Sequence, residues 1–283
     1  MSAPVFLAEA GDLGSLAPGD TYLLDGLEGR HAGVVQRRGV GERIDVVDGE
    51  GLRLTCRVTA VQASEVTLQV VSVEREPSDG VSLVLVQALA KGDRDELAIE
   101  AATEAGVDAV LPWQAERSVV VWRGDRAAKS RARWVATVRA ATKQARRASL
   151  PGVGDVVDAK GLAARSAQVV AAGGTVLVLH EEATLPIAQA VLPVLPALPA
   201  LPALGAGAQG PAAQTPEDSA TGSDAPREIL VVVGPEGGIS ERECTLLTES
   251  GATLVRLGPH VLRTSTAGPI AVALLSERLG RWA

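Results

Sequence analysis

The apolar positions of the chain follow two different patterns, and the change falls near residue 77. In the range 52–58 apolar and polar residues alternate, which is typical of strands that bury one face. After a turn-forming stretch at 77–80, apolar residues instead run continuously through 82–90. Continuous runs predict strands that are buried on both faces, as in a parallel sheet. We therefore predict an all-β domain over residues 1–76 and an α/β domain over residues 77–283.

The second half of the chain repeats a strand-then-helix order, which implies parallel strands joined by crossovers. Asp93 followed by Glu96 predicts a capped helix that Gly106 ends, with an apolar face that includes Leu97. Continuous runs predict buried strands at 82–90, 107–111, 174–182, 229–233 and 252–257. The same signals predict three more helices: one capped by Ser240 and Glu243, one with Trp134, Val138 and Ala141 on its buried face, and one over 266–281.

Residues 186–226 differ in composition from the rest of the chain. Leu-Pro and Ala-Leu-Pro repeats pass into a tract of Ala, Gly, Gln, Ser and Thr with few large side chains. Such a segment cannot bury enough apolar surface to offset the entropy of ordering it. We therefore predict an extended, disordered insertion. It interrupts the α/β domain, because the strand at 229–233 needs the earlier strands as neighbours.

Two glycine loops follow the last two predicted strands. Gly234-Pro235-Glu236-Gly237-Gly238 comes after 229–233, and Gly258-Pro259-His260 comes after 252–257. In open α/β sheets ligands bind outside the carboxyl ends of the strands, so the loops predict neighbouring walls of one crevice. A tight turn without a ligand stays the alternative for the first loop taken alone. Neither loop has the G-x-G-x-x-G pattern or the phosphate loop that ends in G-K-[ST].

Charge is distributed unevenly along the chain. The 283 residues carry a net charge of −7, which disfavours a protein that binds nucleic acid over its whole surface. Residues 117–147, by contrast, hold many arginines and lysines and a single carboxylate, Asp125. This segment is either a solvated helix face or a footprint for RNA phosphates, and both interpretations stay open. The same two choices apply to Arg37 and Arg38, which precede a glycine in the β domain.

Several classes of site and protein are disfavoured. Cys56 and Cys244 are too few and too far apart for a disulfide framework or a zinc pattern, and we interpret Cys244 as a packing residue. His180 has no second histidine at metal-ligand spacing, so we expect no metal. The N-terminus lacks the pattern of a secretory leader, and no apolar run reaches the length of a membrane span. We expect a soluble cytoplasmic protein with no membrane partner.

The motifs after residue 90 resemble those of the bacterial 16S ribosomal RNA (uracil-N3)-methyltransferases, which belong to the SPOUT superfamily. The order and spacing of these motifs fit over most of the chain outside the insertion. The matching blocks are Lys91-Gly92-Asp93-Arg94, Glu104-Ala105-Gly106-Val107, Glu116-Arg117-Ser118, Gln144 with Arg147 and Pro151, Gly234-Pro235-Glu236-Gly237-Gly238, and Leu257-Gly258-Pro259-His260-Val261-Leu262-Arg263-Thr264.

The resemblance implies a fold, a cofactor and an assembly. The fold would be a SPOUT-type knotted parallel-sheet α/β domain preceded by a small PUA-like β-barrel that binds RNA. The protein would be a homodimer that holds S-adenosyl-L-methionine in the knot. By similarity, the cofactor would lie against Leu179, His180, Gly234, Pro235, Glu236, Gly237, Gly238, Leu257, Gly258, Pro259, His260, Val261 and Leu262. We expect RNA contacts from Arg37, Arg38, Lys91, Arg94, Arg117 and Arg147.

The implied activity is methylation of N3 of a specific uridine in 16S ribosomal RNA, on the assembled small ribosomal subunit. Uracil N3 is a poor nucleophile while it is protonated, so a cation that favours the deprotonated ring should help. Arg263 is our candidate for this role, and a phosphate contact or an ion pair within its loop is the alternative. Glu236 is the second catalytic candidate, because it could accept a proton. Orientation of the cofactor or of its own glycine loop is the competing role.

The sequence departs from the family pattern at one position that bears on activity. The family usually continues Arg-Thr-Glu-Thr-Ala, whereas this chain has Ser265 where the carboxylate would stand. A role for that carboxylate therefore cannot be carried over. Two alternatives stay open: a SPOUT methyltransferase that acts on another RNA, and a non-catalytic RNA-binding factor in ribosome assembly.

Overall fold

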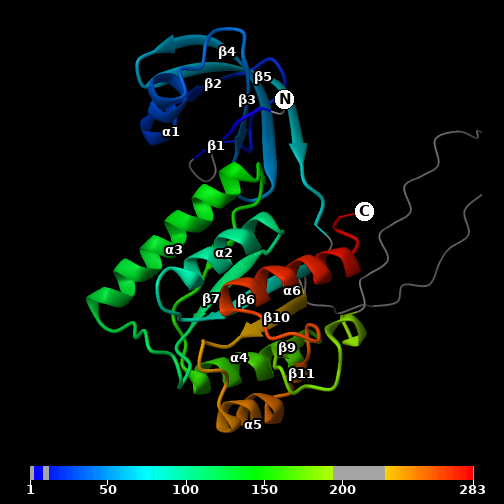
Figure 1. The fold of residues 1–283 in the computed structure, drawn as a ribbon. Coiled ribbons are helices and arrows are strands. Elements are labelled where there is room, and N and C mark those ends of the chain that lie inside the picture. The colour runs from blue at the N-terminus through cyan, green and yellow to red at the C-terminus, as the bar shows by residue number, and fades with distance from the viewer. Residues whose placement is uncertain (1–2, 9–12, 79, 194–226, 283) are drawn as a thin grey trace, which may run out of the picture.

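The structure is a computed structural model that describes residues 3–8, 13–78, 80–193 and 227–282, and it contains two sheets (Figure 1). The first sheet ends at Arg75 and the second begins at Val81, on either side of the predicted turn. The five strands of the first sheet pair in the order β1-β3-β4-β5-β2. They are β1 (Val5–Leu7), β2 (Thr21–Leu24), β3 (Arg43–Val47), β4 (Leu52–Gln62) and β5 (Glu65–Arg75).

Alternation along β4 buries one face of the N-terminal sheet, as the period of two predicts. Leu54, Cys56 and Val58 are almost fully buried, and Thr55 and Arg57 between them are more exposed. The buried side chains form one core with Phe6, Ile44 and Leu68. Burial, with a contribution from the charge of Asp45, raises the pKa of the Cys56 thiol to about 12, so it acts as a packing group.

A short helical segment interrupts the N-terminal sheet, so the all-β prediction is wrong here. Helix α1 (Gly26–Arg30) continues into a π-helix, η1 (His31–Val35). Glycines let this segment approach the β4–β5 turn, since a Cβ at Gly29 would lie 2.2 Å from the Ser64 carbonyl oxygen and one at Gly33 would lie 2.5 Å from that of Ala63. The helical segment is positioned by this close backbone approach and not by an apolar face. The periodicity of the sequence therefore does not predict the helix.

The second sheet has six parallel strands in the order β11-β9-β10-β6-β7-β8, which confirms the predicted parallel α/β architecture. Its side chains alternate between two cores: Leu83 and Leu85 of β6 point to one, and Val84 and Val86 to the other. The strands are β6 (Val81–Ala88), β7 (Ala109–Trp113), β8 (Gly152–Val153), β9 (Thr175–Leu179), β10 (Arg227–Val233) and β11 (Thr253–Val255).

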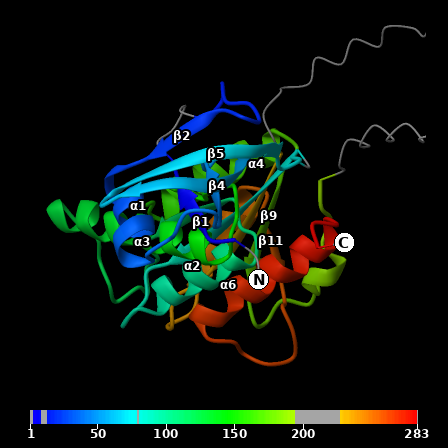
Figure 2. The same ribbon diagram turned by 90° about the horizontal axis from the view of Figure 1, so that it is seen from above.

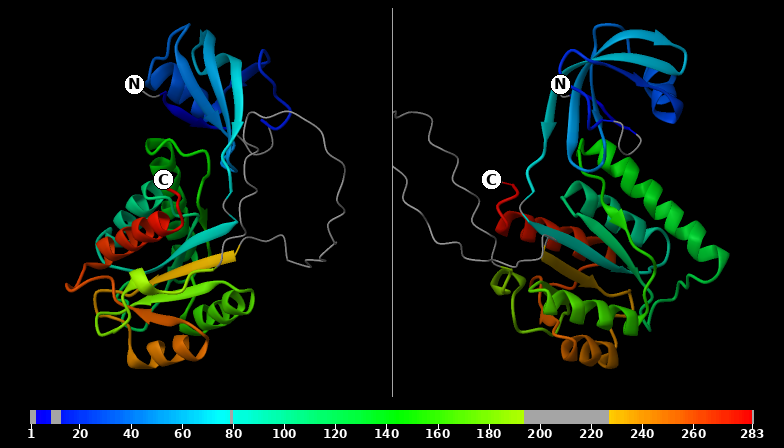
Figure 3. Two further views of the ribbon diagram at one scale, coloured as in Figure 1. Left: turned by 90° about the vertical axis from the view of Figure 1, so that its right-hand side faces the viewer. Right: turned by 180° about the vertical axis from the view of Figure 1, so that it is seen from behind.

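Helices cover both faces of the parallel sheet (Figures 1 and 3). On one face, α2 (Arg94–Glu104), α3 (Asp125–Gln144) and α6 (Thr264–Arg278) contribute Ile99, Trp134 and Leu275 to the core. On the other face lie α4 (Ala159–Ala171) and α5 (Glu241–Glu249). The prediction that Trp134, Val138 and Ala141 share a buried face of one helix is confirmed.

The two predicted helix caps have different outcomes. Ser240 and Glu243 form the predicted capping box at the start of α5, in which each side chain accepts a hydrogen bond from the other residue's backbone N–H. Asp93 precedes α2 but makes no side-chain cap, because its backbone is in the left-handed region with φ 61°. Leu97 is 54% exposed and does not belong to the buried face of α2, so that part of the prediction is also wrong.

The first residues of the predicted insertion are ordered. Pro186 bridges to Arg256, and Ile187 is buried in a 3-10 helix, η2 (Ile187–Gln189). Arg278 of α6 donates hydrogen bonds to the carbonyl oxygens of Ile187 and Ala190. Residues 186–193 therefore belong to the ordered α/β domain. The rest of the predicted insertion, 194–226, lies outside the described residues.

The N-terminal sheet lies over the α/β domain in the view of Figure 2, and β1 and the α1–η1 segment contact α3 near its carboxyl-terminal end. Lys143 Nζ lies 2.7 Å and 2.9 Å from the two carboxylate oxygens of Glu28 and 3.0 Å from His31 Nδ1. Arg139 donates to the same carboxylate at 3.4 Å. A small apolar cluster of Val5, Leu7, Val47 and Ala148 lies beside these contacts. Polar and apolar contacts together fix one domain on the other.

Candidate functional site

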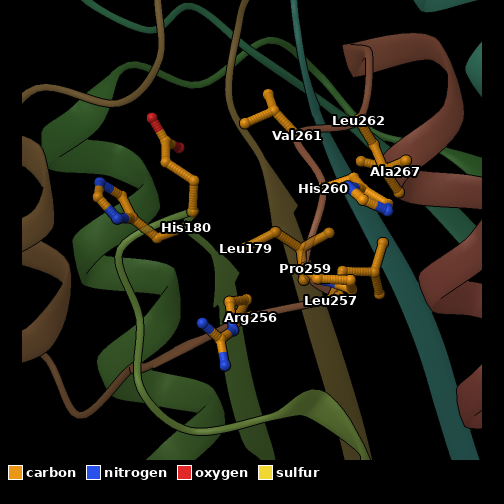
Figure 4. Close-up of a pocket in the computed structure, with 11 residues that line it drawn as sticks. Leu179, His180, Arg256, Leu257, Pro259, His260, Val261, Leu262 and Ala267 are labelled. Carbon is orange, nitrogen blue, oxygen red and sulfur yellow. The ribbon is translucent and has the colours of Figure 1, made fainter.

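Two adjoining cavities open at the carboxyl ends of β9, β10 and β11, where the sequence predicts a crevice. Their volumes are about 150 Å³ and 400 Å³. Figure 4 shows the smaller cavity, which is lined by Leu179 and His180 from the end of β9 and by residues 256–262 from the end of β11 and the loop after it. The two glycine loops are not on neighbouring strands, because β9 lies between β10 and β11. They flank the end of β9 instead, and this places Leu179 and His180 between them.

The structure gathers nearly all of the predicted cofactor residues around these cavities. The smaller cavity is lined by Leu179, His180, Leu257, Gly258, Pro259, His260, Val261 and Leu262, and the larger by Leu179, Gly234, Pro235, Glu236, Gly238, Val261 and Leu262. Gly237 is the predicted residue that lines neither. Sequence reasoning missed six other residues of the walls: Glu181, Val233, Arg256, Ile239, Thr264 and Ala267. Each lies within a few residues of a predicted one, so extending the motifs along the chain would have found them.

The fold requires some of the glycines in the two loops and does not require others. A Cβ at Gly234 would lie 2.6 Å from Ile239 Cγ1, and Gly238 has a φ of +72°, so the fold itself requires both. Gly258 has no neighbouring atom within 4 Å of a built Cβ, and its φ is not in the left-handed region. The fold does not require glycine at 258, although that residue lines the smaller cavity. Its missing side chain leaves space open to a ligand.

Glu236 is held by the segment after β6. Its Oε1 accepts hydrogen bonds from the Lys91 backbone N–H at 3.1 Å and from Arg94 Nη1 at 2.9 Å. Burial alone would raise the pKa of this carboxyl, but backbone hydrogen bonds from Glu236 itself and Lys91, together with Arg94, bring the pKa below its ordinary value. An ionised carboxylate with these partners is a poor proton acceptor and a good anchor for the loop.

A second anchor ties the same loop to the segment after β7. Glu116 accepts hydrogen bonds from the Ser240 hydroxyl at 2.6 Å and from the Arg242 guanidinium, and its own N–H donates to Glu243 at 2.8 Å. Hydrogen bonds from Ser240 and then Arg242 lower the pKa of Glu116. Arg117 Nη1 donates to the Gly237 carbonyl oxygen at 3.0 Å. The Glu116-Arg117 motif therefore supports the loop from outside the cavity.

Arg263 lies at the mouth of the larger cavity. It is the residue that immediately precedes α6, and its exposed side chain makes no hydrogen bond or ion pair with any described residue. Arg94 lines the same cavity but is paired with Glu236. Among the described residues of this wall, the Arg263 guanidinium is therefore the unpaired cation, available to a substrate oxygen or a phosphate.

Much of the basic segment 117–147 is used inside the protein, which corrects its interpretation as one RNA footprint. Arg147 donates to the carbonyl oxygens of Thr103 and Val107, both at 2.7 Å, and burial lowers its pKa despite nearby carboxylates. We therefore withdraw Arg147 as an RNA contact. Intramolecular partners also engage the side chains of Arg131, Arg133, Arg139 and Lys143.

The remaining predicted RNA contacts lie on the surface. The side chains of Arg37 and Lys91 are exposed and have no partner among the described residues. Arg38 donates to Gln36 and Glu42. Arg123, Arg126 and Lys129, at the amino-terminal end of α3, are exposed and unpaired in the described part of the chain. The basic surface is thus narrower than the sequence predicts and centres on the start of α3.

No group of three or more His, Cys, Asp or Glu side chains with metal-site geometry occurs in the described ranges. His180 Nδ1 accepts from the Glu182 N–H at 3.3 Å. Within those same ranges, no helix is long and apolar enough to cross a membrane.

Known proteins resemble this chain over nearly its whole length. A family model described as an RNA methyltransferase domain matches residues 77–276. Ribosomal RNA small subunit methyltransferase E of Mycobacterium bovis is 41% identical over 93% of this chain and 89% of the relative, and that of Bacillus subtilis is 29% identical over 90% of both. The crystal structure of the same enzyme from Neisseria gonorrhoeae, bound to S-adenosyl methionine, aligns with a TM-score of 0.71 and 25% identity over 98% of each chain. The chain therefore belongs to the family of RNA methyltransferases whose members include the ribosomal RNA small subunit methyltransferases E.

Proposed function

We propose that this protein transfers a methyl group from S-adenosyl-L-methionine to N3 of a specific uridine in 16S ribosomal RNA on the small ribosomal subunit. The observation that carries the proposal is the paired cavity at the ends of β9, β10 and β11, with an unpaired arginine at its mouth. The relatives named for methylation of small-subunit ribosomal RNA support the substrate class.

The cavity residues fit a nucleoside-like methyl donor. Leu179, Leu262 and Ala267 offer apolar contact to both cavities, while the glycine loops bring backbone N–H and C=O groups close to a ligand. The donor supplies an electrophilic methyl group on sulfonium sulfur. The protein must hold the uracil ring in line with that methyl, and positioning of this kind accounts for a large part of a rate enhancement.

Arg263 is the proposed catalytic residue. Removing the N3 proton places negative charge on the uracil oxygens, and an unpaired guanidinium near them lowers the cost of that charge. Glu236 is proposed as a positioning residue for the glycine loop, because its carboxylate is already paired and its pKa is lowered. The target uridine must be unpaired or extruded, since N3 is hidden in a base pair.

The proposal includes two architectural features that the family resemblance implies. One is a knotted path of the C-terminal chain, supported by the return of β11 past β10 to pair with β9. The other is a PUA-like role in RNA binding for the N-terminal sheet, supported by the exposed Arg37. The family resemblance that implies the cofactor site also implies both of these features.

A homodimer is also part of the proposal. Ile270 and Leu274 are one turn apart on the outer side of α6 and are 38% and 42% exposed. Val261, at the cavity rim, is 82% exposed, and Leu97 of α2 is 54% exposed. Helices α2 and α6 pack together, so these side chains lie on neighbouring elements. A second copy of the chain on this face would cover apolar surface next to the cofactor site.

The deciding experiment incubates the purified protein with labelled S-adenosyl-L-methionine and small ribosomal subunits that lack the modification, followed by nucleoside analysis. The expected product is labelled 3-methyluridine in 16S ribosomal RNA. Label on another base, or only in another RNA, would show that the protein is a methyltransferase with a different target from the one proposed. A protein that binds the subunit but not the cofactor in calorimetry would be the non-catalytic assembly factor that Ser265 leaves open.

A further inference from the structure

A buried chain of hydrogen bonds connects three elements behind the larger cavity. Gln87 of β6 is fully buried, and its Nε2 donates to Thr264 Oγ1 at 2.8 Å. The Thr264 hydroxyl, at the start of α6, donates to the carbonyl oxygen of Gly234 at 2.8 Å. These two bonds join β6, α6 and the first glycine loop, which are far apart in the sequence.

The direction of the chain is fixed by its chemistry. A carbonyl oxygen can only accept, so the single hydroxyl proton of Thr264 must point to Gly234. Thr264 Oγ1 must then accept from the side chain of Gln87, which orients the Gln87 amide with Nε2 toward Thr264. This orientation leaves Gln87 Oε1 buried without a hydrogen-bond partner in the described structure. An unsatisfied buried acceptor lowers stability, so its presence favours a role other than stabilisation.

A glycine in α6 makes the close approach possible. Gly268 follows Thr264 by one helical turn and lies on the same side of α6. A Cβ at Gly268 would lie 3.0 Å and 3.1 Å from the Leu85 side chain and 3.4 Å from Gln87 Oε1. Helix α6 therefore sits on β6 at a separation that few other residues allow, and at this separation Gln87 reaches Thr264.

The residues at the end of the chain belong to the functional site. Gly234 and Thr264 both line the larger cavity, and Arg263 immediately precedes Thr264. The Thr264 hydroxyl thus sets the distance between the loop that holds the methyl donor and the backbone that carries the proposed catalytic arginine. We propose that Gln87 and Thr264 are positioning residues that hold the donor loop and Arg263 in one geometry. This inference rests on the proposed function of the cavity.

The test compares four variants by cofactor affinity in calorimetry, kcat on small subunits and melting temperature. Thr264→Val removes the hydroxyl and keeps the shape, and we expect a loss of about tenfold in both affinity and kcat. Thr264→Ser keeps the hydroxyl and should stay within about threefold of the wild type. Gln87→Leu should weaken binding while leaving the melting temperature unchanged or higher, because it also removes the unpaired Oε1.

Thr142→Val is the matched control. Thr142 is as buried as Gln87, and its hydroxyl donates to the Val138 carbonyl oxygen at 2.8 Å, in α3 and away from the cavities. It should lower the melting temperature without changing affinity or kcat. The proposal is overturned if Thr264→Val and Thr142→Val behave alike in the two functional measurements, or if Thr264→Ser is as impaired as Thr264→Val.

Hydrogen exchange without cofactor separates this inference from the proposed function. The hydrogen-bond chain from Gln87 through Thr264 to Gly234 predicts faster exchange of the backbone N–H groups of residues 236–240 in Thr264→Val than in the wild type, whether or not the cavity binds a methyl donor. If the wild type does not bind S-adenosyl-L-methionine but this difference is seen, the proposed function fails and the positioning of the loop stands. Equal exchange in the two proteins refutes the positioning role of this hydrogen-bond chain.

Discussion

At the scale of single residues, Gly234 is a glycine that the fold requires, whereas Gly258 is one that leaves space for a ligand. Gly258→Ala should change the free energy of unfolding by less than about 0.5 kcal/mol, because nothing lies near the new methyl group. The methyl would occupy cavity space, so we expect affinity for S-adenosyl-L-methionine to fall by about tenfold. Gly234→Ala is the contrasting variant and should cost about 1–3 kcal/mol through its clash with Ile239. Calorimetry and urea unfolding measure both effects, and unchanged cofactor affinity in Gly258→Ala would contradict the assigned site.

Arg263 carries a second prediction at this scale. Arg263→Ala should lower kcat by about 10²-fold, because a charge that acts in the transition state is lost. Cofactor affinity should change little, since the guanidinium is exposed and contacts no described residue. Arg263→Lys should recover part of kcat. Single-turnover methyl transfer with saturating cofactor measures the chemical step. A variant that loses only affinity for the subunit would identify Arg263 as a phosphate contact instead.

At the scale of elements, the continuous apolar runs and the capping box were predictable because each is encoded within a few neighbouring residues. The strand from Ile229 to Val233 and the cap at Ser240 are examples. The misses have two different causes. Asp93 does not cap α2 because its own backbone is left-handed, and residues 187–190 of the predicted insertion are ordered because Arg278, distant in sequence, donates hydrogen bonds to their carbonyl oxygens. The candidate site was predicted mainly through the resemblance, since glycine loops alone do not identify a ligand.

The anchor between Glu116 and α5 yields a prediction about pH. The pKa of Glu116 is below its ordinary value of 4.5 in the folded protein, so the stabilisation from this carboxylate is fully present above pH 4.5. It is lost as the pH falls through the folded pKa. Glu116→Gln should therefore lower the melting temperature at pH 7, and the difference from the wild type should shrink below pH 4.5. Glu241→Gln, an exposed first-turn carboxylate of the same helix, is the control and should show a smaller difference at pH 7.

At the scale of the whole molecule, the proposed function on a ribosomal subunit requires that the N-terminal sheet and the cofactor site reach the RNA together. The contact that fixes them is concentrated at Glu28, which is 13% exposed and pairs with Lys143 and Arg139. Sequence periodicity could not reveal this contact, because it joins residues more than a hundred positions apart. It also explains why the basic helix is less available to RNA than its composition suggests. Part of its charge orients one domain on the other.

Glu28→Gln tests whether the contact between Glu28 and α3 fixes the orientation of the two domains. The substitution keeps the shape but leaves the half-buried Lys143 without its carboxylate, so the domain contact should weaken by about 2 kcal/mol. We expect KM for small subunits to rise, because the two domains that we propose to contact RNA are no longer held in one orientation, while affinity for S-adenosyl-L-methionine stays at the wild-type value. Glu42→Gln is the matched control, since Glu42 forms an exposed pair with Arg38 in the same domain and such pairs contribute about 0–1 kcal/mol. If Glu28→Gln and Glu42→Gln have the same KM, the domain orientation does not limit recognition of the subunit, and the N-terminal sheet must find its RNA independently of α3.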